Sequence, residues 1–240
     1  MIEKKCGGCG VTVQVEIPPG LSETYRTFME RLGAVCDECA DKNELERERA
    51  EKEQKRIEYL DRVRASRLPQ ALIGLDFTQL DSTENESRAT AVKAAEAWGR
   101  GDIKGLVLSG PVGVGKSRMA GAATNLRLWY RMVDWVSVPA LIVAMKAGFG
   151  TKERQEASKL LIGGNALVLD DLDKVKPSDF AVDVLFQAIE QRINRGAPLL
   201  VTTNLHGNEI AKLLGDPIRS RLSGYCKAVW IDGRDRRRSP

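Results

Sequence analysis

Apolar and polar positions divide the chain into two unlike parts. Residues 11–17 alternate apolar and polar side chains, which is typical of a strand. Continuous apolar runs come much later, at residues 104–109, 166–170 and 198–203, and each has the length of a buried strand. Residues 117–131 are predicted to form a helix directly after the first of these runs. The later part of the chain is therefore predicted to hold the larger core.

Between these parts, residues 41–66 are dominated by Glu, Lys and Arg. Ile57, Leu60 and Arg64 stand three and four residues apart, so side-chain pairs support a helix. The segment has neither a heptad repeat nor a broad apolar stripe, which favours a solvated helical linker over a helix that binds a partner. Pro69 ends any continuing helix because it lacks an amide donor. The predicted divisions are a module at 1–41, a linker at 42–66, a main domain at 67–232 and a basic tail at 233–240.

Composition and charge exclude several classes of protein. With 240 residues, 42% hydrophobic and 29% charged, the chain matches an ordinary globular protein. The net charge is +4, and residues 233–240 carry most of it with four Arg against one Asp, so charge is weak support for a nucleic-acid partner. No apolar run approaches the roughly 20 residues that cross a bilayer, and the first residues do not resemble a secretory signal. We therefore expect a cytoplasmic protein with no membrane partner.

Four cysteines form two pairs with two-residue spacers, Cys6 with Cys9 and Cys36 with Cys39. Without a secretory signal, such pairs indicate metal ligands rather than disulfides. Zn²⁺ prefers four thiolates in a tetrahedron, and a two-residue spacer lets one turn present two of them. A redox pair is the alternative, but the larger βαβ context of a thioredoxin-like pair is missing. We predict a zinc-ribbon-like module with a structural Zn²⁺.

The first apolar run leads directly into residues 110–117, which read GPVGVGKS and match the GxxxxGK[ST] pattern of a P-loop. Glycines in such a loop let backbone amides surround phosphate oxygens, and the helix that follows directs its positive dipole end toward them. Lys116 is expected to neutralise the β- and γ-phosphates, and the Ser117 hydroxyl to bind Mg²⁺. The predicted nucleotide-binding residues are Gly110, Pro111, Val112, Gly113, Val114, Gly115, Lys116, Ser117 and Arg118.

Two other runs end in polar residues that suit a nucleotide site. Asp170 and Asp171 end the run ALVLDD, and a buried strand that carries an acid at its end is how a P-loop protein holds Mg²⁺. Asp170 is the predicted metal-side residue, and Asp171 is predicted to orient or deprotonate the attacking water. Asn204 follows the third run, where its amide can donate to the γ-phosphate or position water. The alternatives are an ordinary polar turn after each strand.

Arg219 and Arg221, spaced by one residue, complete the candidate catalytic groups. They are either salt-bridged surface residues or a source of an arginine finger that reaches a neighbouring subunit's nucleotide.

Taken together, these residues resemble the AAA+ ATPases, and within them the DnaC/DnaI/IstB group of helicase loaders and transposition ATPases. The match covers residues 68–238 and rests on GPVGVGKS, ALVLDDLDKVKPSDFAVDVLFQAIEQRI, LLVTTNL and IRSRL followed by a strand. The resemblance implies an α/β fold. Its P-loop AAA+ domain has a parallel five-stranded sheet with helices on both faces and no C-terminal helical lid, preceded by the small zinc-ribbon-like module.

The resemblance also implies roles for individual residues. In that group the first acid binds Mg²⁺ and the second activates water, which selects Asp170 and Asp171. The strand-end Asn204 corresponds to sensor 1, and the Arg of the SRL box, here Arg221, acts on the adjacent subunit. A further Arg beyond the last strand resembles sensor 2, for which we predict Arg237, while its neighbours in the Arg triplet stay open.

The expected function is ATP-dependent loading of a replicative DnaB-type hexameric helicase onto single-stranded DNA during DNA replication, in a compact form that suits a phage-encoded protein. Its cofactors would be ATP or ADP, Mg²⁺ and Zn²⁺, and its subunits would associate into a spiral or ring through the ATP interface. The Cys₄ module favours this function over that of an IstB-like transposition ATPase, which binds DNA and activates a transposase. A non-hydrolysing nucleic-acid adaptor is a third alternative.

Residues 139–159 are the candidate track for single-stranded DNA. Basic side chains would follow the phosphates there, and Phe149 could stack on a base. The alternative is a mobile surface loop with Phe149 facing the core. The basic residues are Lys146, Lys152, Arg154 and Lys159.

Overall fold

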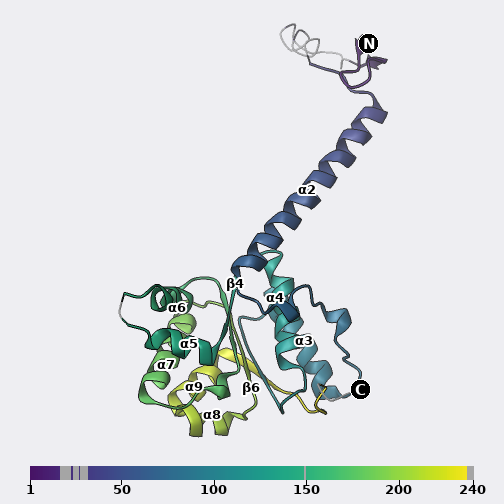
Figure 1. Ribbon diagram of the computed structural model, residues 1–240. Coiled ribbons are helices and arrows are strands. Elements are labelled where there is room, and N and C mark those ends of the chain that lie inside the picture. The colour runs from purple at the N-terminus through teal and green to yellow at the C-terminus, as the bar shows by residue number, and fades with distance from the viewer. Residues whose placement is uncertain (17–22, 24–26, 28–31, 149, 237–240) are drawn as a thin grey trace. The chain divides into compact units, whose positions relative to one another are not determined.

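The computed structural model describes residues 1–16, 23, 27, 32–148 and 150–236. The chain divides into two compact units, Met1–Ile57 and Glu58–Pro240 (Figure 1). None of the described helices is long and apolar enough to cross a membrane.

The first unit contains a small antiparallel sheet and the cysteine pairs. Strand β1 (Ile2–Lys5) pairs with β2 (Thr12–Val15), with Ile2 opposite Val15 and Lys5 opposite Thr12. Within the predicted alternating segment, Thr12–Val15 form a strand, while Ile17 lies outside the described residues. The partner strand β1 was not predicted from the sequence.

Helix α2 (Asp37–Ala65) begins inside the second cysteine pair, earlier than the predicted linker. Two acidic residues in its first turn, Asp37 and Glu38, favour this start because they complement the positive end of the helix dipole. The helix ends before Pro69, where Arg67 adopts a left-handed φ of 60°. Its last turns, from Glu58 onward, belong to the second unit, where Arg62 Nε donates to the Leu128 carbonyl oxygen at 2.7 Å.

The second unit is built on a five-stranded sheet with the order β4-β5-β6-β3-β7, in which all pairs of neighbours are parallel. This confirms the predicted sheet. Because the strands are all parallel, the residues that follow β3, β5 and β6 emerge at the same edge of the sheet. The P-loop strand β3 lies between β6 and β7. The strands are β3 (Gly105–Ser109), β4 (Val133–Ser137), β5 (Ala166–Asp170), β6 (Leu199–Thr203) and β7 (Cys226–Trp230).

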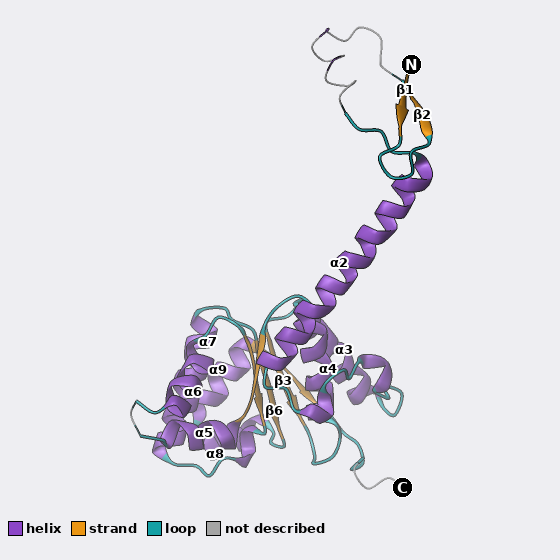
Figure 2. Cartoon of the chain, turned by 45° about the horizontal axis from the view of Figure 1, so that its top comes forward, coloured by secondary structure: helices purple, strands orange, loops and turns teal. Residues whose placement is uncertain are grey.

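Helices cover both faces of this sheet, as predicted (Figure 2). Within β3, Leu106 and Leu108 pack in one core while Val107 packs in the other, because successive side chains of a strand point to opposite faces. Burial on both faces explains why the strands read as continuous apolar runs. One face carries α3 (Glu86–Arg100) and α4 (Lys116–Leu128), and the other carries α5 (Val138–Lys146), α6 (Lys152–Ile162), α7 (Asp179–Asn194), α8 (Gly207–Leu214) and α9 (Asp216–Tyr225).

Three short 3₁₀ helices complete the described elements: η1 (Gln70–Leu72), η2 (Phe77–Gln79) and η3 (Leu172–Lys174). Of these, η3 follows β5 directly and therefore brings its residues to the same edge of the sheet as the P-loop.

Candidate nucleotide site

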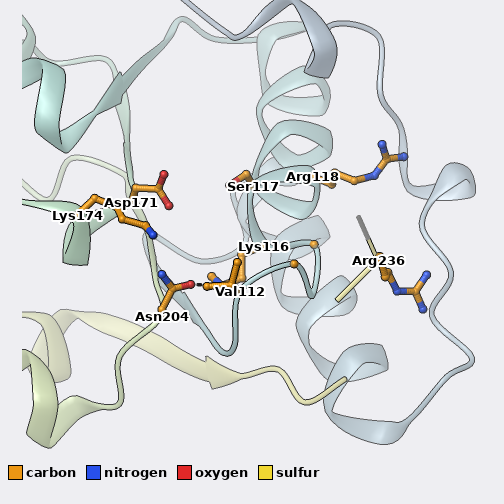
Figure 3. Close-up of a pocket in the computed structure, with 10 residues that line it drawn as sticks. Val112, Lys116, Ser117, Arg118, Asp171, Lys174, Asn204 and Arg236 are labelled. Carbon is orange, nitrogen blue, oxygen red and sulfur yellow. Dashed lines mark hydrogen bonds between the residues drawn. The ribbon is translucent and has the colours of Figure 1, made fainter. Parts of the chain in front are cut away.

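A cavity of about 440 Å³ opens where β3 passes through the P-loop into α4 (Figure 3). This volume lies within the range of small-molecule sites. Gly113 and Gly115 have φ values of 83° and 98°, which L side chains rarely adopt, so glycine is needed to form the loop. The cavity is lined by Val112, Gly113, Gly115, Lys116, Ser117, Arg118, Asp171, Lys174, Asn204 and Arg236.

Lys116 is buried, and its ammonium group donates to acceptors of the P-loop and of Asn204. Nζ donates to the carbonyl oxygens of Gly110 and Pro111 and to Oδ1 of Asn204, each at 2.8 Å. An ammonium group only donates, and all three of these partners are acceptors. A phosphate that enters the cavity would offer Lys116 a charged acceptor in place of neutral ones.

Ser117 and Asp170 come together as the sequence predicts for a magnesium site. Ser117 Oγ donates to Asp170 Oδ1 at 3.0 Å, and Thr202 Oγ1 donates to the same oxygen at 2.6 Å. Burial raises the pKa of Asp170 above its ordinary value, although both hydroxyl groups oppose the change. A hydroxyl beside a carboxylate is a donor set that fits Mg²⁺. Thr202 was not identified from the sequence, because its hydroxyl lies in an apolar run.

Asp171 follows Asp170 but points elsewhere. Its φ and ψ of 60° and 53° are left-handed, a conformation that Asp tolerates better than most residues. Its backbone N–H donates to Thr202 Oγ1 at 3.0 Å. In Figure 3, Asp171 and Asn204 lie on one side of the cavity, and Arg118 and Arg236 lie on the other. The left-handed turn thus separates two consecutive carboxylates into two positions.

Asp173, in η3, holds Asn204 and was missed in the sequence. Its Oδ2 accepts from Asn204 Nδ2 at 2.6 Å, and its Oδ1 accepts from the Asn204 backbone N–H at 2.7 Å and from Thr203 Oγ1 at 3.1 Å. Burial alone would raise the pKa of Asp173, but these donors outweigh it and lower the pKa below its ordinary value. The available signal was a third carboxylate in LDDLD.

Arg236 is the member of the C-terminal Arg triplet that lines the cavity. Its backbone N–H donates to the Gly113 carbonyl oxygen at 3.1 Å. Its guanidinium pairs with Asp81 at 2.9 Å and with Glu84, and it lowers the pKa of both acids. Arg237, predicted from the resemblance, lies outside the described residues.

Arg221 does not line this cavity. It lies on α9, where its Nε is 2.5 Å from Glu190 Oε2 of α7, and about half of its side chain is exposed. The neighbouring Arg219 pairs with Asp216 at 3.1 Å on the same helix. The structure therefore brings Lys116, Ser117, Asp170, Asp171 and Asn204 together and leaves Arg221 on another surface.

The cysteine pairs of the first unit form one cluster. Their four Sγ atoms all lie within 4.8 Å of one another, and a tetrahedral Zn²⁺ with Zn–S bonds of about 2.3 Å would need edges of about 3.8 Å. N–H donation from Cys36 and Gly8 contributes to lowering the pKa of Cys6 to about 6, which favours a thiolate. A Cβ on Gly8 would lie 2.9 Å from Cys39 Sγ, so only glycine fits there. The cluster is compatible with zinc.

The candidate DNA segment 139–159 forms parts of α5 and α6 rather than an open loop. Lys146, Lys152 and Lys159 are exposed, while Arg154 is partly buried and donates to the Ala147 carbonyl oxygen at 3.4 Å. Phe149 lies outside the described residues.

Comparison with known proteins identifies the family. The family model for IstB-like ATP binding proteins matches residues 31–239, which is most of the chain. The chain belongs to the IstB-like ATP binding protein family. This places the IstB-like protein among the AAA+ ATPases, as the sequence resemblance implied.

The relatives and solved structures most similar to this IstB-like protein include replication proteins. It is 30% identical over 135 residues to the replicative helicase loader DnaC of Escherichia coli strain K12, covering 55% of this chain. The chain spans only about half the length of that relative, 54%. At 22% identity, the DnaI structure has a TM-score of 0.61 and covers 71% of this chain and 94% of its own.

Two further solved structures share the fold of the IstB-like protein. The DnaC helicase loader has a TM-score of 0.60 at 20% identity, with 68% of this chain and 99% of that chain covered. The replication initiator DnaA bound to AMPPCP and single-stranded DNA has a TM-score of 0.58 at 19% identity, with coverage of 70% and 52%. These likenesses establish the AAA+ fold.

Proposed function

We propose that the protein loads a replicative DnaB-type hexameric helicase onto single-stranded DNA and hydrolyses ATP between adjacent subunits to do so. The observation that carries the chemistry is the cavity lined by Lys116, Ser117, Asp171 and Asn204. Asp170 lies directly behind it, where its carboxylate accepts from Ser117. The similarity to the curated loader DnaC supports the biological role.

In this function Lys116 leaves the loop carbonyls and binds the β- and γ-phosphates of ATP. Ser117 and Asp170 would hold Mg²⁺, which supplies charge neutralisation for the phosphates. The Thr202 hydroxyl keeps the Asp170 carboxylate oriented toward Ser117. Arg118 and Arg236, on the opposite side of the cavity, add positive charge near the phosphates (Figure 3).

Asp171 acts as the base. The oxygen of a water molecule forms a bond to the γ-phosphorus while the bond from that phosphorus to the β–γ bridging oxygen breaks, which yields ADP and phosphate. The proton that the water loses passes to the Asp171 carboxylate. The left-handed turn gives this carboxylate a position in the cavity that Asp170 does not occupy.

Arg221 completes the site of the next subunit. Because it lies on α9, away from its own cavity, it can act only on a neighbour's ATP, where it stabilises the developing charge. Such a head-to-tail contact repeats into a ring or an open spiral. Glu190 holds the guanidinium in the isolated chain and would release it on assembly.

The remaining parts of the proposal concern the partners. The four thiolates would hold a structural Zn²⁺ in a reducing compartment such as the cytoplasm, and the resulting module would contact the helicase. The exposed lysines of α5 and α6 would follow the phosphates of single-stranded DNA.

A transposition ATPase that activates a transposase is the second candidate, because the matching family model is that of IstB-like proteins. It would use the same nucleotide residues with another partner, so partner identity separates the two functions.

The deciding experiment has two stages. The full-length tagged protein is incubated with extract of its source cells and ATP, and the bound proteins are identified by mass spectrometry. The recovered helicase is then supplied with circular single-stranded DNA that carries an annealed oligonucleotide and is coated with single-strand binding protein. Displacement of the oligonucleotide is measured with wild-type protein or with Lys116→Ala. Helicase recovery and ATP-dependent loading by the wild type alone are expected. Recovery of a transposase instead would overturn the loader function and leave the nucleotide chemistry in place.

A further inference from the structure

The side-chain amide of Asn204 lies between two charged groups of opposite sign. Its Nδ2 donates to Asp173 Oδ2 at 2.6 Å, and its Oδ1 accepts from Lys116 Nζ at 2.8 Å. A carboxylate only accepts and an ammonium only donates. Turning the amide over would place oxygen against the carboxylate and NH₂ against the ammonium, so the two charges fix its orientation.

Asp173 is well placed to maintain this orientation when Lys116 moves. It accepts from the backbone N–H of Asn204 at 2.7 Å and from Thr203 Oγ1 at 3.1 Å, in addition to the amide. The carboxylate is thereby bound to the end of β6 at three points, and none of them involves the P-loop. Loss of the Lys116 contact would leave the amide held from its nitrogen side.

We propose that Asp173 is a positioning residue that makes Asn204 present its carbonyl oxygen, and not its NH₂ group, to the attacking water. The proposal deepens the ATP hydrolysis proposed above and rests on it. Once Lys116 binds phosphate, Asn204 Oδ1 becomes an acceptor without its donor. Phosphate oxygens are themselves acceptors and cannot bond to it, whereas a water molecule can.

This geometry assigns both hydrogens of the water. One O–H donates to Asn204 Oδ1, and the other proton passes to the Asp171 carboxylate as the water oxygen bonds to the γ-phosphorus and the bridging oxygen departs with ADP. Asn204 and Asp171 lie on the same side of the cavity, as a single water requires (Figure 3). Asn204 is thus an acceptor for water rather than a donor to the γ-phosphate, which the sequence left open.

Asp173→Asn tests the positioning role with a side chain of equal size. The Oδ1 atom of the new side chain would still accept from the backbone N–H of Asn204. Its NH₂ group would face the Asn204 side chain and donate to the Asn204 oxygen, which favours the amide in the opposite orientation. We expect kcat to fall about tenfold to hundredfold, as for a catalytic group misplaced by a small distance, while KM and ATP affinity change less than about threefold. The matched control is Asp183→Asn, an exposed residue of α7 that should leave turnover unchanged.

Exchanging the side chains of residues 173 and 204 tests whether residue 204 acts as a hydrogen-bond acceptor or as a donor. Asn204→Asp alone would place two carboxylates at the 2.6 Å contact and should lose at least as much turnover as Asp173→Asn. In Asp173→Asn/Asn204→Asp, the new amide donates to the new carboxylate, whose other oxygen again faces the cavity. We expect the double variant to recover at least about tenfold over Asn204→Asp. A residue that must donate to phosphate could not recover, because a carboxylate has no hydrogen to give.

Each variant is first checked for thermal unfolding and for binding of a fluorescent ATP analogue. An Asp173→Asn protein that binds the analogue and turns over ATP within about twofold of wild type overturns the positioning role. A double variant whose turnover is no higher than that of Asn204→Asp overturns the acceptor role. The double variant remains informative even where Asp173→Asn alone unfolds, because it restores the hydrogen-bonded pair. A wild-type protein that releases no phosphate, with or without DNA, overturns the proposed ATPase activity itself and with it this inference.

Discussion

Arg88 Nη1 donates a hydrogen bond to the backbone carbonyl oxygen of Val114 at 2.6 Å, so a cation of α3 supports the P-loop from behind. Only 3% of Arg88 is exposed, and burial lowers the pKa of its guanidinium. The P-loop is therefore held by a buried group that is not among the residues lining the cavity.

We predict that Arg88→Met lowers the free energy of unfolding by about 1.5–3 kcal/mol, the contribution typical of a hydrogen bond to a charged group. Affinity for ATP should fall as well, because the P-loop loses a support. Urea unfolding and titration with a fluorescent ATP analogue measure the two effects. Arg100→Met, an exposed residue of the same helix, should change stability by no more than about 0.5 kcal/mol. Equal effects of both variants would contradict a special role for Arg88.

Arg221→Ala should abolish DNA-stimulated ATP hydrolysis, with a loss on the order of 10³-fold, while ATP affinity stays near that of wild type. Arg219→Ala, two residues away on the same helix, is the matched control and should retain most activity. In a mixture of the Arg221→Ala and Lys116→Ala variants, the Arg221→Ala subunits supply an intact nucleotide cavity. The Lys116→Ala subunits supply an intact Arg221. Partial recovery in the mixture is expected for action between subunits, and absence of any recovery would argue against it.

Removing zinc should expose four thiols and no more. With zinc bound, the cluster cysteines should react slowly with Ellman's reagent, and a strong chelator should release one metal and make four thiols reactive. Cys226 should stay unreactive until the protein unfolds, because burial raises the pKa of its thiol to about 12. Cys226→Ser should bind the same amount of zinc as wild type, whereas Cys36→Ser should bind much less. A fifth thiol reactive in the folded protein would show that this part of β7 opens.

Arg236 should make stability depend on pH through Asp81 and Glu84. Because Arg236 holds both pKa values below their ordinary range, the stabilisation is present above the unfolded pKa values of about 4 and is lost as pH falls through the folded values. Arg236→Gln should therefore be less stable than wild type at pH 5–8, and the difference should shrink below about pH 4. Unfolding curves in urea across this range measure it, and a difference that grows toward low pH would contradict the pairing.

The sheet and the central phosphate site could be predicted because their signals are local. Strands buried on both faces appear as apolar runs, and the P-loop places Lys116 and Ser117 at fixed positions relative to β3. Asp170 follows from the same reasoning, since all strands of a parallel sheet end at the same edge, and β5 is separated from β3 by β6 alone.

The contacts that refine the site could not be predicted, since they depend on turns and on residues far apart in the sequence. Asp173 reaches Asn204 only because η3 follows the left-handed turn at Asp171. Arg221 finds Glu190 on another helix, 31 positions earlier in the chain. The path of the chain after β7 decides that Arg236 lines the cavity, and three identical neighbours give no sequence signal for that choice.

The left-handed turn at Asp171 also determines how the protein can be trapped with ATP bound. Replacing this acid by Ala would remove the proposed base but place an ordinary residue at φ 60°, at a cost of about 1–2 kcal/mol. Asn tolerates that conformation and matches the carboxylate in size. Asp171→Asn is therefore the better substitution for capturing the protein with bound nucleotide and the proposed helicase partner in one complex for imaging.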